Sequence, residues 1–481
     1  MATTVAQPGW SPPAVVPGRS ARPVRPTPTR VRLIAATLTV ALFALFALMA
    51  VTAAAFLQAR ARAQTVTSRA ATAATAGDLY FALADLDAEA ARLVLLGDGD
   101  FQSAGDGTFA GNQLSALSAY NARTAQVDAD LQALAAAGGV SISTTSGTSA
   151  TTSTGTGTGS TGTTTGGTGA SAGSAGADTS VLAADVTQYR SVADAAIGLD
   201  EFPGVFAGSP TPTAIGFYGR AETLMHDVVL PAAEDLRQST AAASTSAASD
   251  AHVWAMAGLI GTLALGIVTV GALVIAQRAF TRWYRRLLNP ALLAATAITV
   301  ALVGGAMVAL SSASQDAQAS GQRLTAYLQV VKIRADSYDA DGAAVRSVLM
   351  PFLDWNTVTR QAAAVALELK APSGVPGDST QLWTDGPEAD YALIHTDVEN
   401  GDVASALSVE TGTARHEDAF DFFDYDQGLE AISGDRLASF RQASDSLSND
   451  LGPWLWLPWA MAGAALVLVG LGVRPRLAEY R

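Results

Sequence analysis

Leu33–Leu57 reads LIAATLTVALFALFALMAVTAAAFL, and this stretch contains no charged residue and no histidine. A helix of about 20 apolar residues is long enough to cross a hydrocarbon layer ~30 Å thick. Three later stretches have the same character, namely Val253–Gln277, Ala291–Ser311 and Pro453–Val473. The sequence therefore predicts an all-α membrane protein with four transmembrane helices. Because the first stretch has 25 residues and follows a 32-residue leader, we interpret it as a retained anchor rather than a cleaved signal peptide.

The arginine residues predict how these helices are oriented. Segments 1–32, 278–290 and 474–481 together contain 12 basic residues and one acidic residue, whereas segments 58–252 and 312–452 contain 17 basic and 42 acidic residues. Short loops rich in Arg stay on the cytoplasmic side of a membrane. We therefore expect a multi-pass protein of the cell membrane with both termini in the cytoplasm and two extracytoplasmic domains.

The composition excludes several classes of protein. The 481 residues carry a formal net charge of −14 at pH 7, which argues against a nucleic-acid partner. The absence of cysteine excludes disulfides, thiolate nucleophiles and cysteine-ligated metals. No glycine-rich motif for nucleotide phosphates is present. We expect no enzymatic activity, no catalytic residue, no cofactor and no metal site. The acidic run Glu417–Asp426 keeps a calcium site open as the minor alternative to a solvated helix start.

The chain repeats one segment at an offset of 254 residues. Asp85–Leu95 reads DLDAEAARLVL and Asp339–Leu349 reads DADGAAVRSVL, and both fit the pattern D-x-D-x-x-A-x-R-x-V-L. The same offset places the first predicted span over the third. We interpret this as a tandem duplication of a unit made of one span, one ectodomain and a second span.

Apolar residues spaced three and four apart predict helices in both acidic segments. In the first segment this seam runs from Leu79 to Leu93, and Gly97 ends the helix. In the second segment the opening seam runs from Leu324 to Leu349 and the closing seam from Leu429 to Leu451. We expect each segment to be an antiparallel helical bundle. Pro231 predicts a kink in the last helix of the first bundle.

Two segments of low complexity are predicted to be disordered. The tail 1–32 is rich in Pro and Arg and is expected in the cytoplasm. The insert 141–177 is composed almost entirely of Ser, Thr, Gly and Ala and cannot form an apolar core. An O-glycosylated stalk is the alternative interpretation of this insert.

Two sets of charged residues are candidate contact sites. The repeated motif supplies the first set, which either binds a ligand or partner outside the membrane or forms ion pairs within the bundle: Asp85, Asp87, Arg92, Asp339, Asp341 and Arg346. The loop between the second and third spans supplies the second set, which either anchors the chain to membrane lipid or contacts a cytoplasmic partner: Arg278, Arg282, Trp283, Arg285 and Arg286.

The predicted spans themselves contain stripes of small residues and no ionisable residue. Gly258, Thr262 and Gly266 share one face of the second span, and Gly305 shares a face of the third span with neighbouring alanines. Small residues allow close packing of transmembrane helices. The absence of ionisable residues at membrane depth argues against a transporter.

One further stretch carries a resemblance to a known family. Ile215–Ala233 reads IGFYGRAETLMHDVVLPAA, which resembles a pattern A-Y-L-R-E-A-S-x-L-M followed by L-L-P-A-A. That pattern is typical of actinobacterial four-span membrane sensor proteins encoded beside a glutamine-binding lipoprotein and the Ser/Thr protein kinase G. The chain departs from it at Phe217-Tyr218-Gly219 and in the long Ser/Thr/Gly insert.

The resemblance implies a role in amino-acid sensing. It implies that the chain couples an extracytoplasmic solute-binding lipoprotein to a cytoplasmic Ser/Thr kinase and has no enzymatic activity of its own. Two alternatives remain open from the residues. The chain could be a structural or scaffolding protein of the cell envelope, or it could bind a small ligand directly, as four-helix chemoreceptor ectodomains do. A homo-oligomer is compatible with each interpretation.

Overall fold

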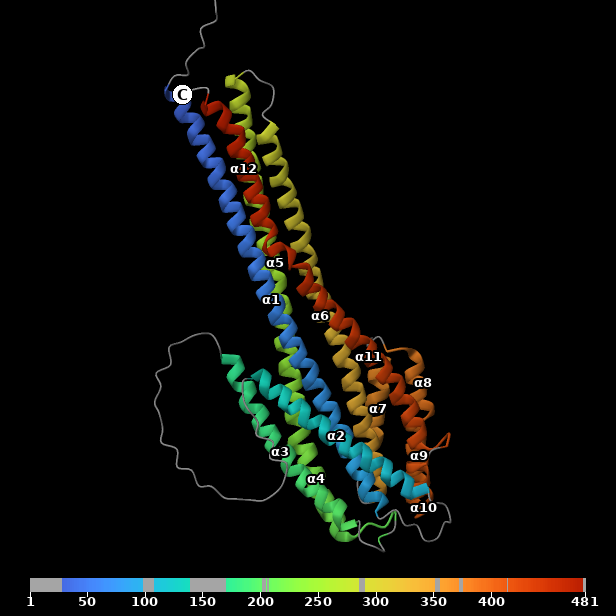
Figure 1. The fold of residues 1–481 in the computed structure, drawn as a ribbon. Helices are drawn as coiled ribbons and strands as arrows, with labels where there is room; N and C mark the ends of the chain where they lie inside the picture. The colour runs from blue at the N-terminus through green and yellow to red at the C-terminus, as the bar shows by residue number, and fades with distance from the viewer. Residues whose placement is uncertain are drawn as a thin grey trace, which may run out of the picture. The chain divides into compact units, whose positions relative to one another are not determined.

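The computed structural model describes residues 28–97, 108–138, 170–200, 205, 207–284, 290–350, 355–371, 375–412 and 414–478. Within these ranges the secondary structure consists of helices and short helical turns, without a β-strand (Figure 1). The prediction of an all-α chain is therefore confirmed for the part of the chain that the structure describes.

Three long helical stretches are apolar enough to cross a membrane. They are Thr39–Leu96 within α1 (Pro28–Leu96), Pro212–Ala279, which ends in α5 (Leu230–Tyr284), and Pro290–Leu349, which is α6. The second and third predicted spans lie inside them, and the first predicted span, Leu33–Leu57, overlaps the first stretch from Thr39 onward. The region of the fourth predicted span starts with a 3-10 turn, η2 (Pro453–Leu455), and continues in α12 (Leu457–Ala478), whose described apolar part ends at Leu468. The fold is thus that of an α-helical membrane protein.

The chain divides into two compact units. The first contains segments 1–50, 264–303 and 460–481, as far as they are described. In this unit the small residues of α5 lie against neighbouring helices. A side chain on Gly266 would come within 2.7 Å of Val303 in α6. The hydroxyl of Thr269 donates a hydrogen bond to the carbonyl oxygen of Ala44 in α1 at 3.2 Å.

The second unit contains segments 51–263 and 304–459. Its helices are the C-terminal parts of α1 and α6, the N-terminal part of α5, and the following elements: α2 (Thr108–Gly138), α3 (Ala170–Asp200), α4 (Pro212–Leu224), η1 (Met225–Val229), α7 (Asn356–Lys370), α8 (Gly377–Asp385), α9 (Pro387–Glu399), α10 (Val403–Thr411) and α11 (Asp418–Asp450). One continuous cluster of buried apolar side chains joins residues from both acidic segments. The two acidic segments therefore share one core within this unit.

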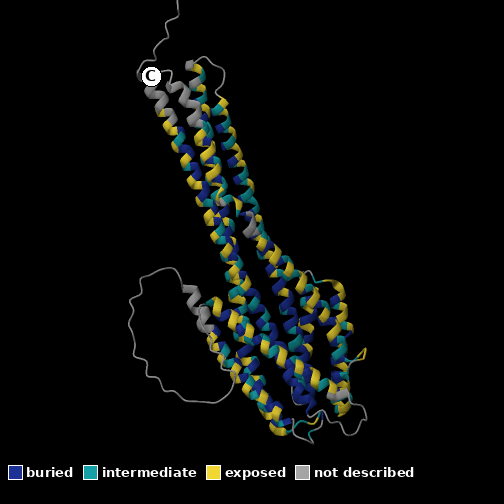
Figure 2. Cartoon of the chain, in the orientation of Figure 1, coloured by how far each residue is buried: buried dark blue, intermediate teal, exposed yellow. Residues whose placement is uncertain are grey.

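The repeated motif lies at the centre of this core. Residues 81–91 of α1 and 340–349 of α6 are buried on every side of the helix, which Figure 2 shows as continuous dark blue. A helix that is buried all round must pack against neighbours in every direction. The predicted seam is confirmed at Leu79, Leu83 and Leu86, which are fully buried.

The repeat also sets where α1 and α6 cross. A Cβ atom on Gly342 would lie 3.2 Å from the Cα atom and 3.3 Å from the Cβ atom of Ala88. Ala88 and Gly342 are equivalent positions at the 254-residue offset, so the two repeats meet at the same residue of each copy. Such self-complementary contact is the signature of an approximate two-fold relation. A side chain at 342 would require Ala88 and the guanidinium of Arg346, which would lie 3.0 Å from the added Cβ atom, to shift slightly.

Three local features refine the predictions. Gly97 ends α1 with a left-handed φ of 56° and donates its N–H to the carbonyl of Leu93, as the glycine was expected to do. Pro231 is the second residue of α5, separated from the π-helical turn η1 by one residue, where the wider turn accommodates a residue that cannot donate a backbone hydrogen bond. The predicted disordered insert 141–177 lies outside the described residues up to 169, but its last eight residues form the start of α3.

Candidate functional site

Four of the six charged residues of the repeated motif pair across the two repeats. Arg92 Nη2 in α1 lies 3.0 Å from Asp341 Oδ2 in α6, and Arg346 Nη1 in α6 lies 2.8 Å from Asp87 Oδ2 in α1. Arg92 corresponds to Arg346 and Asp87 to Asp341 at the 254-residue offset, so the two ion pairs are equivalent. The structure therefore supports the interpretation as ion pairs within the bundle, with the added finding that each pair joins one repeat to the other.

Asp87 is the centre of the first cluster. It is 2% exposed and accepts a hydrogen bond from the Tyr189 hydroxyl of α3 at 3.0 Å, while His226 Nε2 of η1 lies 3.2 Å from its Oδ2. Burial acts to raise the pKa of Asp87, but the hydrogen bond from His226 and the charge of Arg346 outweigh it, so the pKa is lowered. Asp87 therefore stays ionised.

The other partners of this cluster come from both repeats. Arg346 also lies 3.5 Å from Glu222 Oε1 in α4 and 3.5 Å from Asp339 Oδ1 in α6. Burial alone would lower the pKa of His226, but the hydrogen bond and charge of Asp87 raise it above its ordinary value. The remaining motif residue, Asp85, pairs with Arg123 of α2, and burial raises its pKa to about 6.

Arg92 is the centre of the second cluster. Its Nη1 lies 3.2 Å from Glu89 Oε1, and its Nη2 lies 3.0 Å from Asp341 and 3.6 Å from Glu410 Oε1 of α10. Burial raises the pKa of Glu89 to about 7 and raises the pKa values of Glu410 and Asp418 well above their ordinary range. One guanidinium thus stands among several buried carboxyl groups.

Asp341, Glu410 and Asp418 also converge on one another. Each of these three buried residues contributes a carboxylate oxygen, and the three oxygens lie within 4.8 Å of one another. They are the described residues that could hold a metal ion. The sequence marked Asp341 through the repeat and Asp418 through the acidic run, but Glu410 carries no such signal, because only the tertiary fold brings α10 beside α6.

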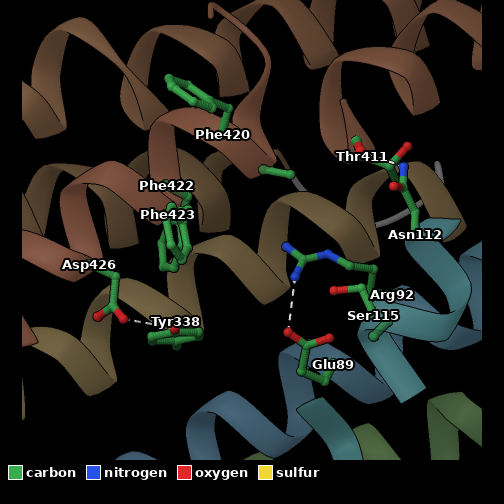
Figure 3. Close-up of a pocket in the computed structure, with 12 residues that line it drawn as sticks. Glu89, Arg92, Asn112, Ser115, Tyr338, Thr411, Phe420, Phe422, Phe423 and Asp426 are labelled. Carbon is green, nitrogen blue, oxygen red and sulfur yellow. Dashed lines mark hydrogen bonds and ion pairs between the residues drawn. The ribbon is translucent and has the colours of Figure 1, made fainter. Parts of the chain in front are cut away.

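A cavity of about 330 Å³ adjoins the Arg92 cluster. Figure 3 shows Glu89 and Arg92 on α1, Tyr338 on α6, and the side chains of α2, α10 and α11 around them. Phe422 and Phe423 of α11 supply an apolar wall, and Phe423 is 61% exposed at the surface. The cavity can therefore receive a group with an apolar part and a polar end.

The second predicted set lies at the end of α5. Arg278 and Arg282 are exposed there. Arg285 and Arg286 lie outside the described residues, as does the side chain of Trp283. The structure therefore places only two of these five side chains.

No family model, curated protein or solved structure matches this chain. The residues and their geometry are consequently the basis for the function proposed below.

Proposed function

We propose that this protein is a non-enzymatic transmembrane sensor or adaptor that passes an extracytoplasmic signal to a cytoplasmic Ser/Thr kinase. In this proposal the chain crosses the cell membrane four times, with both termini and the loop Arg278–Arg286 in the cytoplasm. The acidic segments 58–252 and 312–452 form the outer sensing part. By the resemblance, the signal is amino-acid availability reported by a solute-binding lipoprotein.

The observation that carries the proposal is the reciprocal pairing of the two repeats. Asp87 with Arg346 and Arg92 with Asp341 join α1 to α6. Each of these helices is unbroken between its apolar stretch and its ion pairs. A partner that binds one crossing geometry of α1 and α6 better than another would shift the population of that geometry. Because a continuous helix moves as one body, a change in the crossing of α1 and α6 would also displace the apolar stretches of these two helices.

The cavity beside Arg92 supports a second candidate, a direct receptor for a small ligand. Its wall combines Arg92 and Glu89 with the aromatic rings of Tyr338 and Phe422. A ligand or a partner side chain bound there would contact residues of both repeats at once. Both candidates involve the crossing of α1 and α6. They differ only in whether a small ligand binds directly or is carried by a partner protein.

Three arginine substitutions test the proposed output. Arg282, Arg285 and Arg286 are replaced together by Ser, and kinase-dependent phosphorylation is measured in cells that contain the lipoprotein and kinase. The matched control replaces three exposed arginines of the second unit, Arg360, Arg415 and Arg441, by Ser. We expect loss of output only in the first variant, with co-purification of the lipoprotein unchanged in both.

A normal response of the first variant at a normal expression level would show that the loop anchors lipid and would refute the proposed output. Cysteine labelling tests the orientation in the same cells, since the chain has no native cysteine. A cysteine at position 283 that reacts with an impermeant reagent from outside would contradict the cytoplasmic placement of the loop. Failure of the lipoprotein to co-purify would favour the scaffolding alternative.

A further inference from the structure

The carboxyl groups of Glu410 and Asp418 have no hydrogen-bond partner although both residues are completely buried. Glu410 and Asp418 are 0% exposed, and neither oxygen of either carboxyl group makes a hydrogen bond. A buried polar group without a hydrogen-bond partner destabilises the folded state, and a buried charged group destabilises it more. The burial of these four carboxyl oxygens must therefore be compensated either by a bound ligand or by protonation.

Tyr391 in α9 is a further buried residue whose polar atom has no hydrogen-bond partner. Its hydroxyl makes no hydrogen bond, and Tyr391 is 2% exposed. Burial raises the pKa of this hydroxyl, and Asp418, Asp341 and Glu410 are the charges that raise it further. The three carboxylates that converge on one another come from three different helices, α6, α10 and α11.

The ionised carboxylates and Arg92 together carry a net charge that a cation of charge +2 would neutralise. Arg92 Nη2 supplies one positive charge beside Asp341 and Glu410. Asp341, Glu410 and Asp418 supply three negative charges when ionised, so two negative charges remain. Glu89 contacts the other terminal nitrogen of Arg92 and lies outside this group of three carboxylates. A divalent ion would bring the group to neutrality.

We propose that Asp341, Glu410 and Asp418 bind a hard divalent cation, with Ca²⁺ the preferred ion. The donor set contains only oxygen, which selects Ca²⁺, Mg²⁺ or Mn²⁺ over Zn²⁺ or Cu²⁺. Ca²⁺ takes about 6–8 oxygens at ~2.3–2.6 Å, and three bidentate carboxylates supply six. Mg²⁺ retains several waters, which suits a completely buried group less well. This inference does not depend on the sensor role.

The cation would join three helices of the second repeat to the first repeat. Asp341 comes from α6, Glu410 from α10 and Asp418 from the first turn of α11. Asp341 and Glu410 contact Arg92 of α1. The ion would therefore stabilise the same crossing that the reciprocal pairs hold.

The test uses the full-length protein in detergent, stripped with chelator and dialysed against CaCl₂, MgCl₂ or MnCl₂. Bound metal is counted by mass spectrometry, and thermal unfolding is followed at each metal concentration. We expect about one Ca²⁺ per chain and an unfolding temperature that rises by ~3 °C at 100 times the dissociation constant. The variant Glu410→Gln with Asp418→Asn should lose both effects.

The matched control replaces two exposed carboxylates of α11, Asp424→Asn with Asp435→Asn, and should keep both effects. The alternative, in which protons neutralise the group, predicts no bound metal in the wild-type protein. Absence of all three ions from that protein, or equal binding by the double variant, would overturn the proposal. If the double variant does not fold, Glu410→Gln alone is used, and unchanged metal affinity in it would overturn the proposal equally.

Discussion

The reciprocal ion pairs make a quantitative prediction about the Asp87–Arg346 contact. The substitution Asp87→Asn keeps the shape of the side chain but removes the charge that faces Arg346 at 2.8 Å. Breaking one side of a buried ion pair destabilises a protein by about 3–5 kcal/mol. Glu222 and Asp339 remain 3.5 Å from the Arg346 guanidinium. Because they keep part of its charge compensated, we expect the lower end of that range, ~3 kcal/mol.

A double-mutant cycle separates the pair from its surroundings. We expect Arg346→Met to destabilise by a similar amount, because it leaves Asp87 with only Tyr189 and His226. The double variant should lose less than the sum of the two single variants, with a coupling energy of ~1–3 kcal/mol. The equivalent cycle on Arg92 and Asp341 should give a coupling of the same sign, since the repeat makes the two contacts equivalent.

Hydrogen exchange of the amides in residues 81–91 measures these energies locally, which suits a chain with two compact units. The matched control is the pair Arg190–Asp128 between α3 and α2, at 2.6 Å with Asp128 41% exposed. This pair is only partly buried, and pairs in contact with solvent contribute about 0–1 kcal/mol. A coupling for Asp87–Arg346 no larger than that of the control would refute the reasoning that these pairs hold the repeats together.

Three further predictions concern single residues. The pKa of His226 is raised in the folded protein. The stabilising contribution of His226 is therefore complete below its unfolded pKa of ~6.5 and is lost as pH rises through the higher folded value. The unfolding temperature should accordingly fall between pH 6 and 9, and it should fall less in His226→Gln. Gly342→Ala should destabilise by up to ~2 kcal/mol, since close contact with Ala88 outweighs the helix-propensity gain, whereas Gly434→Ala, which meets nothing within 4 Å, should stabilise by up to ~1 kcal/mol in denaturant unfolding. Trp383 is fully buried and donates its Nε1–H to Ala362, so Trp383→Ala should cost ~3–5 kcal/mol in the same assay, and Trp383→Phe less.

The helices and the central segment were predictable because their signals are local. The apolar runs, the seam from Leu79 to Leu93 and the glycine after it follow from composition and spacing alone. The repeat also implies that Arg92 and Arg346 make equivalent ion pairs. If the two repeats meet about a two-fold axis, each arginine must pair with the aspartate of the other repeat. The register that brings them together, however, is set by the packing of two helices 254 residues apart.

Other parts of the site depend on contacts that no spacing encodes. Arg123 pairs with Asp85 from α2, and Glu410 reaches the Arg92 cluster from α10. Each is a single charged residue on a helix with no repeated counterpart in the motif. The shared core of the two acidic segments was missed for a similar reason. An apolar seam shows that a helix is buried, but it does not show whether its neighbour belongs to the same bundle.

A disulfide across the crossing tests the central claim, that movement between α1 and α6 carries the signal. The chain has no native cysteine, and a Cβ on Gly342 would lie 3.3 Å from the Cβ of Ala88, near the separation that a disulfide needs. Kinase-dependent output is measured in cells for Ala88→Cys with Gly342→Cys, oxidised and reduced, beside each single variant. The account predicts a response that disappears on oxidation and returns on reduction, with both single variants responsive throughout. A cross-linked protein that still responds in full would contradict it.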